Sequence, residues 1–487
     1  MKSKGWSLLA CLLLAAPPAL AQDETGLTDL VAVIHLHSTF SDGAASPAVM
    51  ARAARAAGVD AIVLTDHLLQ RVRYAPWPLG NVMGVAVSRP SVLSHGVARY
   101  LTALAGAEGE APGTLVLPGV ETSPYSRFGG SPLAGSLELQ GWHRHLLVLG
   151  IDDPAGLALL PAAGNRAAWI YGPWSLLYLL PAAALAWSAR RLARPGYEEA
   201  RLGAFRLRQR RRHLGAVLIG IAALAALVAG FPFRIERYSP VGPDPGAAPF
   251  QAMIDAVRAR GGITVWAHPE ARAEDTLQGV HLFTAPYPAL VRETDADGFA
   301  ALPEGVKELL PPGGIWDQAL SDFVAGRRAH PPRAIAELDE HHAPPAVDFG
   351  ILQTVFQVRQ STHAGILEAL RAGRLYARWT PSGAPPLRLL SFSLAARGRS
   401  AGAGGALPLP SGPLSVRFAV GGGGGAVTAR LVRGGAVIWT RRVVPPFSAE
   451  VEDDPGGATF YRLDLEGAYP YRLIANPIFV AARQEAA

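Results

Sequence analysis

Short apolar runs alternate with helical stretches through the first third of the chain and resume after residue 237. Residues 30–34 and 61–64 are β-rich runs, and Ser46-Pro47 and Gly58 between them mark the start and the end of a helix. Further apolar runs lie at 115–117, 146–149 and 263–266. Apolar strands separated by helices are typical of a parallel sheet covered by helices. The number of such units favours a distorted β/α barrel, similar to a TIM barrel, over an open sheet.

From Pro385 onward the pattern becomes that of an all-β protein. Residues 414–418 and 427–431 alternate apolar and polar positions, as half-buried strands do, and a glycine run lies between them. We therefore predict a small C-terminal β-sandwich over residues 383–487.

Two longer uncharged apolar stretches, 167–187 and 214–233, interrupt the alternating pattern. Each has about the 20 residues that a membrane-crossing helix needs. The segment between them contains nine arginines and two acids, a distribution typical of a cytoplasmic loop. The sequence thus predicts a two-helix transmembrane hairpin with a basic cytoplasmic loop over residues 156–236. Pro173 and Pro181 weaken the first span, and a pair of buried core helices is the alternative.

The N-terminus has the features of a secretory signal, with Lys2 and Lys4 before an apolar core and Ala19-Leu20-Ala21 as a cleavage site. An uncleaved anchor is the alternative. With export and two spans, both halves of the barrel would lie on the periplasmic or extracellular side of the inner membrane. The predicted organisation is a signal peptide at 1–21, barrel parts at 22–155 and 237–382, the hairpin at 156–236, and the sandwich at 383–487.

Charge and cysteine content narrow the chemistry. The net charge of the chain is +6, and the arginine-rich loop alone carries more than this excess, so the exported part has no basic patch for nucleic acid. The hydrophobic content of 49% and the mean hydropathy of +0.19 agree with a membrane-embedded protein. Cys11, inside the signal peptide, is the only cysteine, so histidine and carboxylate side chains must hold any metal.

Histidines and acids stand beside most of the apolar runs. They include His35 and His37 after the first run, Asp66 and His67 after the second, and Glu121 after the third. Because the carboxyl ends of strands in a β/α fold meet at one rim, these side chains should converge. Nitrogen and oxygen ligands together suit zinc, manganese or iron, and their number indicates two or three divalent ions. Such a centre activates water as a metal-bridged hydroxide for hydrolysis.

The ordered motifs resemble those of the PHP (polymerase and histidinol phosphatase) family. They are VAVIHLHSTFSDG, IVLTDH, LPGVET, HLLVLGI and GGITVWAHPE, and they cover roughly residues 30–155 and 250–345. The segments STHAGILEALRAGRLYARWT and RLIANPIFV resemble exported members with a small β-domain. The resemblance implies a distorted barrel with a di- or trinuclear metal centre that hydrolyses phosphoesters.

Carried over residue by residue, the resemblance implies the metal ligands His35, His37, Asp42, His67, Glu121, His145, His268, Asp339 and His341. The predicted catalytic residues are Asp66 and His341, and Asp66 is expected to lie behind the ligands, where it orients or charges its neighbours. His342 competes with His341, and His143 competes with His145. The sequence departs from the family at QGVHLF, where His281 stands in place of a common glutamate.

Three functions fit these residues. The first is a phosphoesterase that acts on a small-molecule ester. The second keeps the metals but cleaves carboxylic esters or carbamates, because a bridging hydroxide attacks carbonyl carbon as well as phosphorus. The third is a non-catalytic, membrane-tethered sensor that binds a metal or a ligand. Comparing aryl phosphate with aryl acetate as substrate distinguishes the first two.

Overall fold

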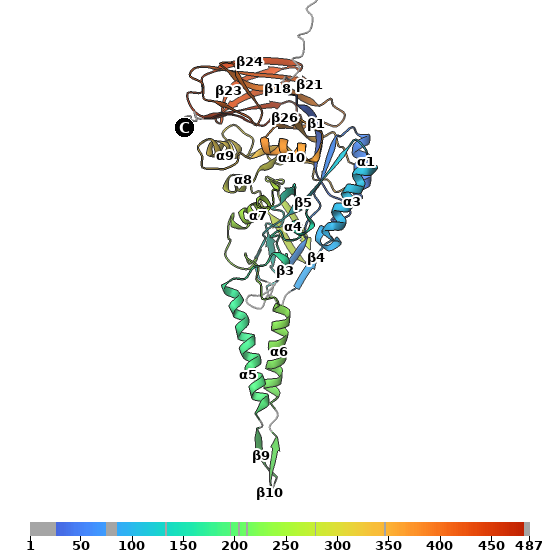
Figure 1. Cartoon of the computed structure of the whole chain (residues 1–487), viewed down its shortest axis with the longest axis vertical. Coiled ribbons are helices and arrows are strands. Elements are labelled where there is room, and N and C mark those ends of the chain that lie inside the picture. The colour runs from blue at the N-terminus through green and yellow to red at the C-terminus, as the bar shows by residue number, and fades with distance from the viewer. Residues whose placement is uncertain are drawn as a thin grey trace, which may run out of the picture.

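The computed structural model describes residues 26–74, 85–131, 134–194, 196–202, 205–210, 213–277, 279–344 and 347–481. The predicted signal peptide at 1–21 lies outside these residues. Three parts follow one another along the long axis of the molecule: a C-terminal pair of β-sheets, a central ring of strands with helices around it, and a projecting helical hairpin (Figure 1).

Seven neighbouring strands form the central ring. Their order is β15 (Arg333–Ala336), β14 (Gly298–Leu302), β11 (Ile263–Trp266), β8 (Leu146–Leu149), β5 (Leu115–Thr122), β2 (Ala61–Leu64) and β1 (Thr28–Leu36). The chain beyond β15 closes the ring on β1, since the Leu338 amide donates to the Ile34 carbonyl at 2.9 Å and Glu340 forms a parallel bridge with Leu36.

One strand of the ring departs from the predicted parallel arrangement. β8 runs antiparallel to both of its neighbours, β5 and β11, whereas the other pairs along this order are parallel. The expectation of an all-parallel sheet is therefore corrected. The reversal brings the start of β8 to the edge where the other strands end, and this places His145 at that edge.

Alternation along the strands divides the apolar side chains between two cores. Ala32, Val63, Leu117, Leu147 and Val265 belong to a core inside the ring. Residues one position away, such as Val33, Ile62 and Val148, face the surrounding helices instead. This is the period of two that a strand requires. At one end, α10 (His363–Ala372) contributes buried side chains to the inner core and so closes the ring.

Helices and small sheets surround the ring. Ser46 and Pro47 start α1, as the sequence predicts. The helices are α1 (Pro47–Ala56), α2 (Val92–His95), α3 (Val97–Glu110), α4 (Pro154–Ala158), α7 (Ala248–Arg258), α8 (Ala289–Glu293) and α9 (Ile315–Val324). The small strands are β3 (Arg71–Tyr74) and β4 (Val85–Ser88), which pair with each other, and β6 (Arg127–Gly129), β7 (Glu138–Gln140), β12 (Ala273–Leu277) and β13 (Val280–Thr284), which form a second sheet.

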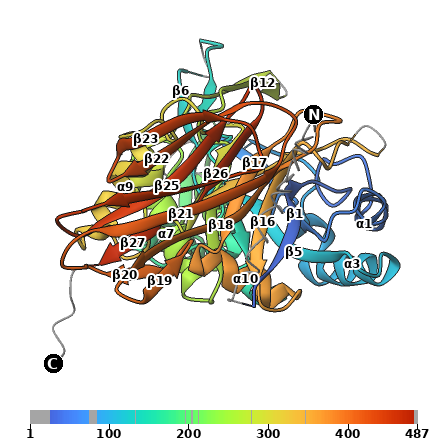
Figure 2. The same ribbon diagram turned by 90° about the horizontal axis from the view of Figure 1, so that it is seen from above.

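The C-terminal region continues the sheet of the ring. After β1 the order runs through β16 (Leu352–Val358), β17 (Leu375–Trp379), β26 (Arg472–Ala475), β25 (Thr459–Glu466), β22 (Val427–Arg433) and β23 (Ala436–Val443), with β27 (Ile478–Ala481) and β20 (Ala406–Pro408) beside β25. A second sheet has the order β19 (Arg399–Gly402), β18 (Leu387–Ala396), β21 (Leu414–Gly422) and β24 (Phe447–Asp453). The two sheets share an apolar core and lie over the ring (Figure 2).

The predicted transmembrane hairpin is wrong. The first apolar stretch breaks into short 3-10 turns at Arg166–Ala168 and Pro173–Tyr178 before α5 (Leu179–Ala193), and α6 (Leu214–Gly230) ends early. With 15 and 17 residues, these helices reach about 22 and 26 Å, below the ~30 Å of a bilayer core. Within the described ranges, no helix has the length and apolar character needed to span a membrane.

The location that depended on those spans, in the inner membrane, is corrected with them. The two helices do pack together and project from the ring, and β9 (Tyr197–Leu202) pairs with β10 (Phe205–Arg210) at their tip (Figure 1). At the base, Ile170 and Ile235 exchange hydrogen bonds of 3.0 and 2.8 Å. The excursion therefore leaves the ring and returns to it at one point.

Candidate metal centre

The predicted ligands gather at the mouth of the ring. Several of them extend the inward-facing rows of the strands: His67 follows Val63, Glu121 follows Leu117, and His145 precedes Leu147, all at even spacing. His268 and Asp339 follow β11 and β15 in the chain. The carboxyl ends of five strands, β1, β2, β5, β11 and β15, and the start of the reversed β8 thus bring residues from 35 to 341 together.

Glu121 lies at the centre of this cluster and is 1% exposed. Its Oε1 atom is 3.2 Å from His35 Nε2, 2.6 Å from His145 Nδ1 and 3.2 Å from His268 Nε2. Its Oε2 atom is 2.9 Å from His67 Nδ1 and 3.5 Å from His37 Nε2. One carboxylate therefore faces two sets of imidazoles, as a bridging ligand between two metals would.

Asp42 and His341 extend the cluster toward solvent. Asp42 Oδ1 lies 3.3 Å from His37 Nδ1, and its Oδ2 lies 3.4 Å from His67 Nε2. The ring of His341 stacks on that of His37, with centroids 4.0 Å apart, and its Nε2 is 3.5 Å from Asp42 Oδ1. Asp339 Oδ1 lies 3.3 Å from His35 and 3.5 Å from His37.

Three overlapping groups of side chains have ligand atoms within 4.8 Å of one another. They are His37 with Asp42, His67 and His341; His35 with His37 and Glu121; and His67 with Glu121 and His145. His37, His67 and Glu121 each belong to two groups. Neighbouring ions that share ligands would use such an overlap.

Three ring nitrogens of the cluster make no hydrogen bond with a described residue, although His268 Nε2 makes one with Glu121 at 3.2 Å. Nε2 of His35, Nε2 of His37 and Nδ1 of His145 are buried and have no hydrogen-bond partner among the described residues, although carboxylate oxygens lie close to each. Donor atoms that converge in this way fit a cation between them better than they fit a hydrogen-bond network. Their nitrogen and oxygen composition suits a divalent transition metal.

The backbone is strained at three positions of the cluster. His35, His268 and Asp339 have φ values of 71°, 28° and 50°, a region that residues other than glycine rarely adopt. The register of β1 against β2 also shifts between Ile34 and Leu36, on either side of His35. Such strain persists where the surrounding structure enforces it and is concentrated at functional sites.

The buried charges shift one another's pKa values. Burial alone opposes charge on His67, yet Glu121 and Asp42 raise its pKa to about 10. Burial likewise opposes charge on His35, but Asp339, Glu121 and Glu337 raise its pKa well above the usual value. His145 differs, because burial lowers its pKa to about 3. Its imidazole is neutral at pH 7, the form that binds metal.

The structure separates the alternatives that the sequence left open. His341 lies in the cluster, whereas the side chain of His342 is 79% exposed and contacts Glu340. His145 contacts Glu121, and His143 is the next ring outward, with centroids 5.4 Å apart. His281 lies on β13 between Glu138 and Glu274, outside the cluster. The role of each of these residues as a ligand stays a prediction.

Asp66 faces the loop after β1 rather than the imidazoles. Its carboxylate accepts hydrogen bonds from the Ser38 amide at 2.8 Å, the Ser38 hydroxyl at 2.8 Å and the Ser41 hydroxyl at 2.7 Å. These bonds fix the loop that carries Asp42. The geometry therefore gives Asp66 a positioning contact, and its predicted catalytic role is untested.

The sequence analysis missed two residues of the site, Glu337 and Tyr287. Glu337 is buried, lies 2.9 Å from His35 Nδ1 and accepts the His268 amide at 2.6 Å. It continues the inward row of Ile335 in β15, so the period of two contained the signal. Tyr287 donates to the Ala267 carbonyl at 2.6 Å and lies 3.2 Å from His268 Nδ1. Nothing in its sequence context marks it.

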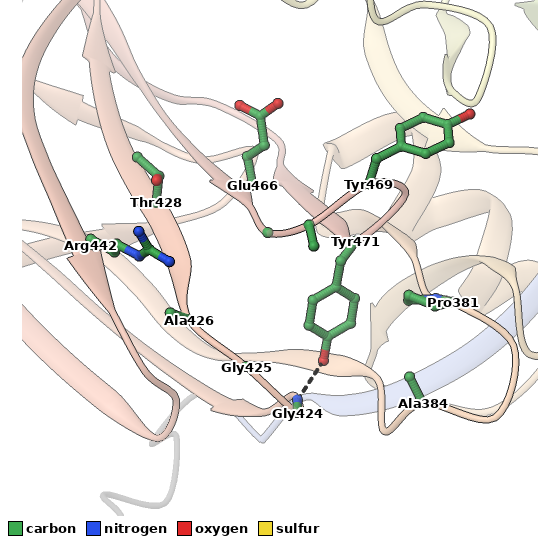
Figure 3. A pocket seen from close by; sticks show the side chains of 12 residues that line it. Pro381, Ala384, Gly424, Gly425, Ala426, Thr428, Arg442, Glu466, Tyr469 and Tyr471 are labelled. Atoms are coloured by element: carbon green, nitrogen blue, oxygen red, sulfur yellow. Dashed lines mark hydrogen bonds between the residues drawn. The ribbon is translucent and has the colours of Figure 1, made fainter.

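A separate recess of about 610 Å³ lies in the C-terminal sheets. The Tyr471 hydroxyl accepts the Gly424 amide there at 3.1 Å, and Arg442, Glu466 and Tyr469 line the recess (Figure 3). None of the residues that line it is a histidine. The clustered histidines therefore lie at the mouth of the ring and not in this recess.

Comparison with known proteins gives distant structural similarities. No family model and no curated protein matches the sequence. The chain is similar to a two-domain protein from Bacteroides vulgatus that contains a predicted PHP-like metal-dependent phosphoesterase, with 13% identity, 91% of this chain and 92% of that chain covered, and a TM-score of 0.37.

Two further similarities cover about two thirds of this chain. A proposed metal-dependent phosphoesterase from Bifidobacterium adolescentis is 16% identical over 66% of this chain and 90% of its own, with a TM-score of 0.25. An amidohydrolase from Chromobacterium violaceum is 18% identical over 65% and 88%, also with a TM-score of 0.25. The similar proteins thus include PHP-like ones, the family that the motifs resemble. At these low scores, a function has to be inferred from the site itself.

Proposed function

We propose that this chain is a metal-dependent hydrolase that cleaves phosphoesters at the mouth of the ring. The observation that carries the proposal is the set of three overlapping ligand groups around Glu121, with buried nitrogen atoms that have no hydrogen-bond partner. Two or three divalent ions bound there would supply an activated water molecule and offset the charge of the reacting phosphate.

In this proposal the residues of the site have three roles: they bind the metals, orient the metal ligands or position the loop of Asp42. The ligands would be His35, His37, Asp42, His67, Glu121, His145, His268, Asp339 and His341. Glu337 and Tyr287 orient the imidazoles of His35 and His268 through the contacts given above. Asp66 positions the loop of Asp42. His341 is 36% exposed at its side chain, so a substrate reaches it before the deeper ligands.

The proposed reaction is simple hydrolysis. The oxygen of water forms a bond to phosphorus, the bond from phosphorus to the ester oxygen breaks, and the alcohol leaves with a proton. An oxyanion develops at phosphorus and at the leaving oxygen, which favours a site rich in positive charge. The buried carboxylates would offset part of the positive charge of the ions, and the substrate would supply the remaining negative charge.

The test begins with purified protein of the full chain. We expect bound transition metal by elemental analysis, turnover of an aryl phosphate, and loss of turnover on chelation with recovery on adding metal. His35→Ala should lose metal and reduce turnover by at least about 100-fold, because ligands matter more than the groups that orient them. His342→Ala is the matched control, since that imidazole points to solvent, and it should retain both.

Two outcomes would contradict the proposal. A folded protein that hydrolyses no ester with zinc, manganese or iron added would exclude the enzyme function and favour the non-catalytic sensor. Turnover of aryl acetate without turnover of aryl phosphate would assign the metals to carboxylic esters.

A further inference from the structure

Three arginines and a tyrosine lie just beyond the candidate ligands along the chain. Arg71 lies four residues after His67, Tyr125 lies four residues after Glu121, and Arg144 directly precedes His145. Four residues reach at most about 14 Å. Arg127, two residues after Tyr125, begins β6. These side chains therefore belong to the loops that form the rim of the metal centre.

One buried polar atom of each residue in this group has no hydrogen-bond partner among the described residues. The Nε atoms of Arg71, Arg127 and Arg144 are shielded from solvent and make no hydrogen bond with a described residue, and the same holds for the hydroxyl of Tyr125. Tyr125 is 4% exposed. A buried donor without a protein partner is unfavourable, and water, an ion or a ligand can satisfy it.

Several contacts connect these residues in space. The phenol of Tyr125 is in the electrostatic field of both Arg127 and Arg144, and of Glu236 as well. Gly164 packs against Arg71 and donates its amide to Glu236 at 3.1 Å. Residues from three loops of the rim thus surround one region.

This region has an excess of positive charge. Two acids, Glu236 and Asp244, face Tyr125 along with the two arginines. Burial raises the pKa of Glu236, against the lowering effect of the Gly164 amide and Arg73. Burial, Arg166 and Arg71 lower the pKa of Arg73, which shows that cations crowd one another here. Some arginines outside this region have carboxylate partners, such as Arg258 with Asp295 and Arg292 with Asp322.

We propose that Arg71, Tyr125, Arg127 and Arg144 form a second anion-binding subsite beside the metal centre, which holds a phosphate group of the substrate other than the one that is cleaved. This inference rests on the proposed phosphoesterase function and narrows its substrates to esters with two phosphate groups. Guanidinium groups suit this task, because their paired N–H donors match two phosphate oxygens and their charge is permanent.

The test compares a substrate with one phosphate to a substrate with two. Arg127→Met and Arg144→Met should each raise KM for a sugar bisphosphate by about 10-fold or more, since each removes a charge-assisted contact. The kcat for that substrate and both constants for an aryl phosphate should change less than about twofold. The unchanged aryl phosphate turnover shows that the variants fold. The KM of Arg127→Lys for the bisphosphate should lie between those of the parent and Arg127→Met, because lysine keeps the charge without the paired N–H donors. Arg292→Met is the matched arginine control.

A binding measurement separates this inference from the proposed function. Inorganic pyrophosphate should bind chelator-treated protein in calorimetry, and Arg127→Met should weaken that binding by about 10-fold. Pyrophosphate binding that depends on the arginines, in a protein that hydrolyses no ester, would support the subsite and overturn the phosphoesterase. Hydrolysis with equal KM values in all variants, or no pyrophosphate binding without metal, would overturn the subsite alone.

Discussion

His35 adopts a backbone conformation that a residue in a regular strand avoids, and its two ring nitrogens face different acids. Nε2 points to Glu121 and Asp339, while Nδ1 lies 2.9 Å from Glu337. If Nδ1 carries the proton and donates it to Glu337, Nε2 is left free for a metal. A carboxylate behind a ligating histidine commonly sets its tautomer in this way.

Replacing Glu337 with glutamine tests this role. Glu337→Gln keeps the shape of the side chain but removes the charge that holds the Nδ1 proton of His35 and the amide of His268. We expect metal affinity to fall about 10- to 100-fold, with the fold retained. Titration with zinc against a competing chelator measures the affinity, and Glu340→Gln serves as the control. Equal affinities in Glu337→Gln and the parent protein would show that this carboxylate does not orient the ligand.

The pKa of His67 gives the metal-free protein a pH dependence. Because Glu121 and Asp42 raise this pKa to about 10 in the folded state, the charged imidazole stabilises the fold fully below its ordinary pKa of 6.5. That contribution is lost as pH rises from about 6.5 to 10. The thermal midpoint of chelator-treated protein should therefore fall over this window. His67→Gln should flatten the fall, and a midpoint that rises with pH in the parent would contradict the assignment.

At the scale of elements, an ion pair fixes the C-terminal sheets to the ring. Arg462 of β25 is fully buried and donates from Nε to Asp317 Oδ1 at 2.6 Å and from Nη2 to Asp317 Oδ2 at 2.8 Å. Asp317 is in the first turn of α9, and the ring of Trp316 lies 5.0 Å from the guanidinium. The pair therefore joins a strand of the sandwich to a helix of the ring.

Removing one partner of this pair should destabilise the protein strongly. Arg462→Met leaves Asp317 buried without its counter-charge, which costs about 3–5 kcal/mol of unfolding free energy. Chemical denaturation followed by tryptophan fluorescence measures the change. The double variant Arg462→Met with Asp317→Leu should recover part of the loss, because both charges are then gone. Equal stability of Arg462→Met and the parent would show that the contact is not formed in solution.

Asn476 makes a second connection between these parts. Its side chain exchanges hydrogen bonds of 2.9 Å with the amide and the carbonyl of Ala334 in β15, and it also donates to Leu375 at 3.2 Å. The amide group therefore acts as a strand residue would at the edge of β15.

At the scale of the whole molecule, the projecting hairpin is the part that was wrongly predicted from the sequence to span a membrane. Length and charge pattern predicted two spans, but the first apolar stretch contains a 3-10 segment that begins at Pro173, and its α-helix starts only at Leu179. Assembly of one site from residues before and after the insertion requires both ends of the insertion to lie on one side. The structure achieves this locally, through the paired backbones of Ile170 and Ile235.

The insertion should be removable without loss of the site. Since Ile170 and Ile235 form a hydrogen-bonded antiparallel pair, an Asn-Gly turn in place of residues 171–234 matches their spacing. We expect the shortened protein to bind metal with the affinity of the parent, within about threefold, because the candidate ligands lie outside the insertion. Elemental analysis and chelator titration measure this. A shortened protein that folds without binding metal would show that the hairpin contributes to the centre.

The sequence by itself determined the residues that can do the chemistry and the elements that carry them. Short continuous apolar runs placed His67, Glu121 and His145 beside predicted strands, and a chain whose only cysteine is Cys11 restricted the ligands to histidine and carboxylate. Local patterns contain this information, because strand alternation and helix starts depend on neighbouring residues.

Only the tertiary structure decided which of these side chains meet. The direction of β8, the choice of His341 over His342 at the cluster, and the contacts of Glu337 and Tyr287 depend on pairing between distant segments. The ends of the two hairpin helices also depend on tertiary structure. Composition placed the end of the first at 187 and of the second at 233, whereas α5 ends at Ala193 and α6 at Gly230. Contacts between residues hundreds of positions apart leave no periodic trace in one sequence, and the metal centre consists of such contacts.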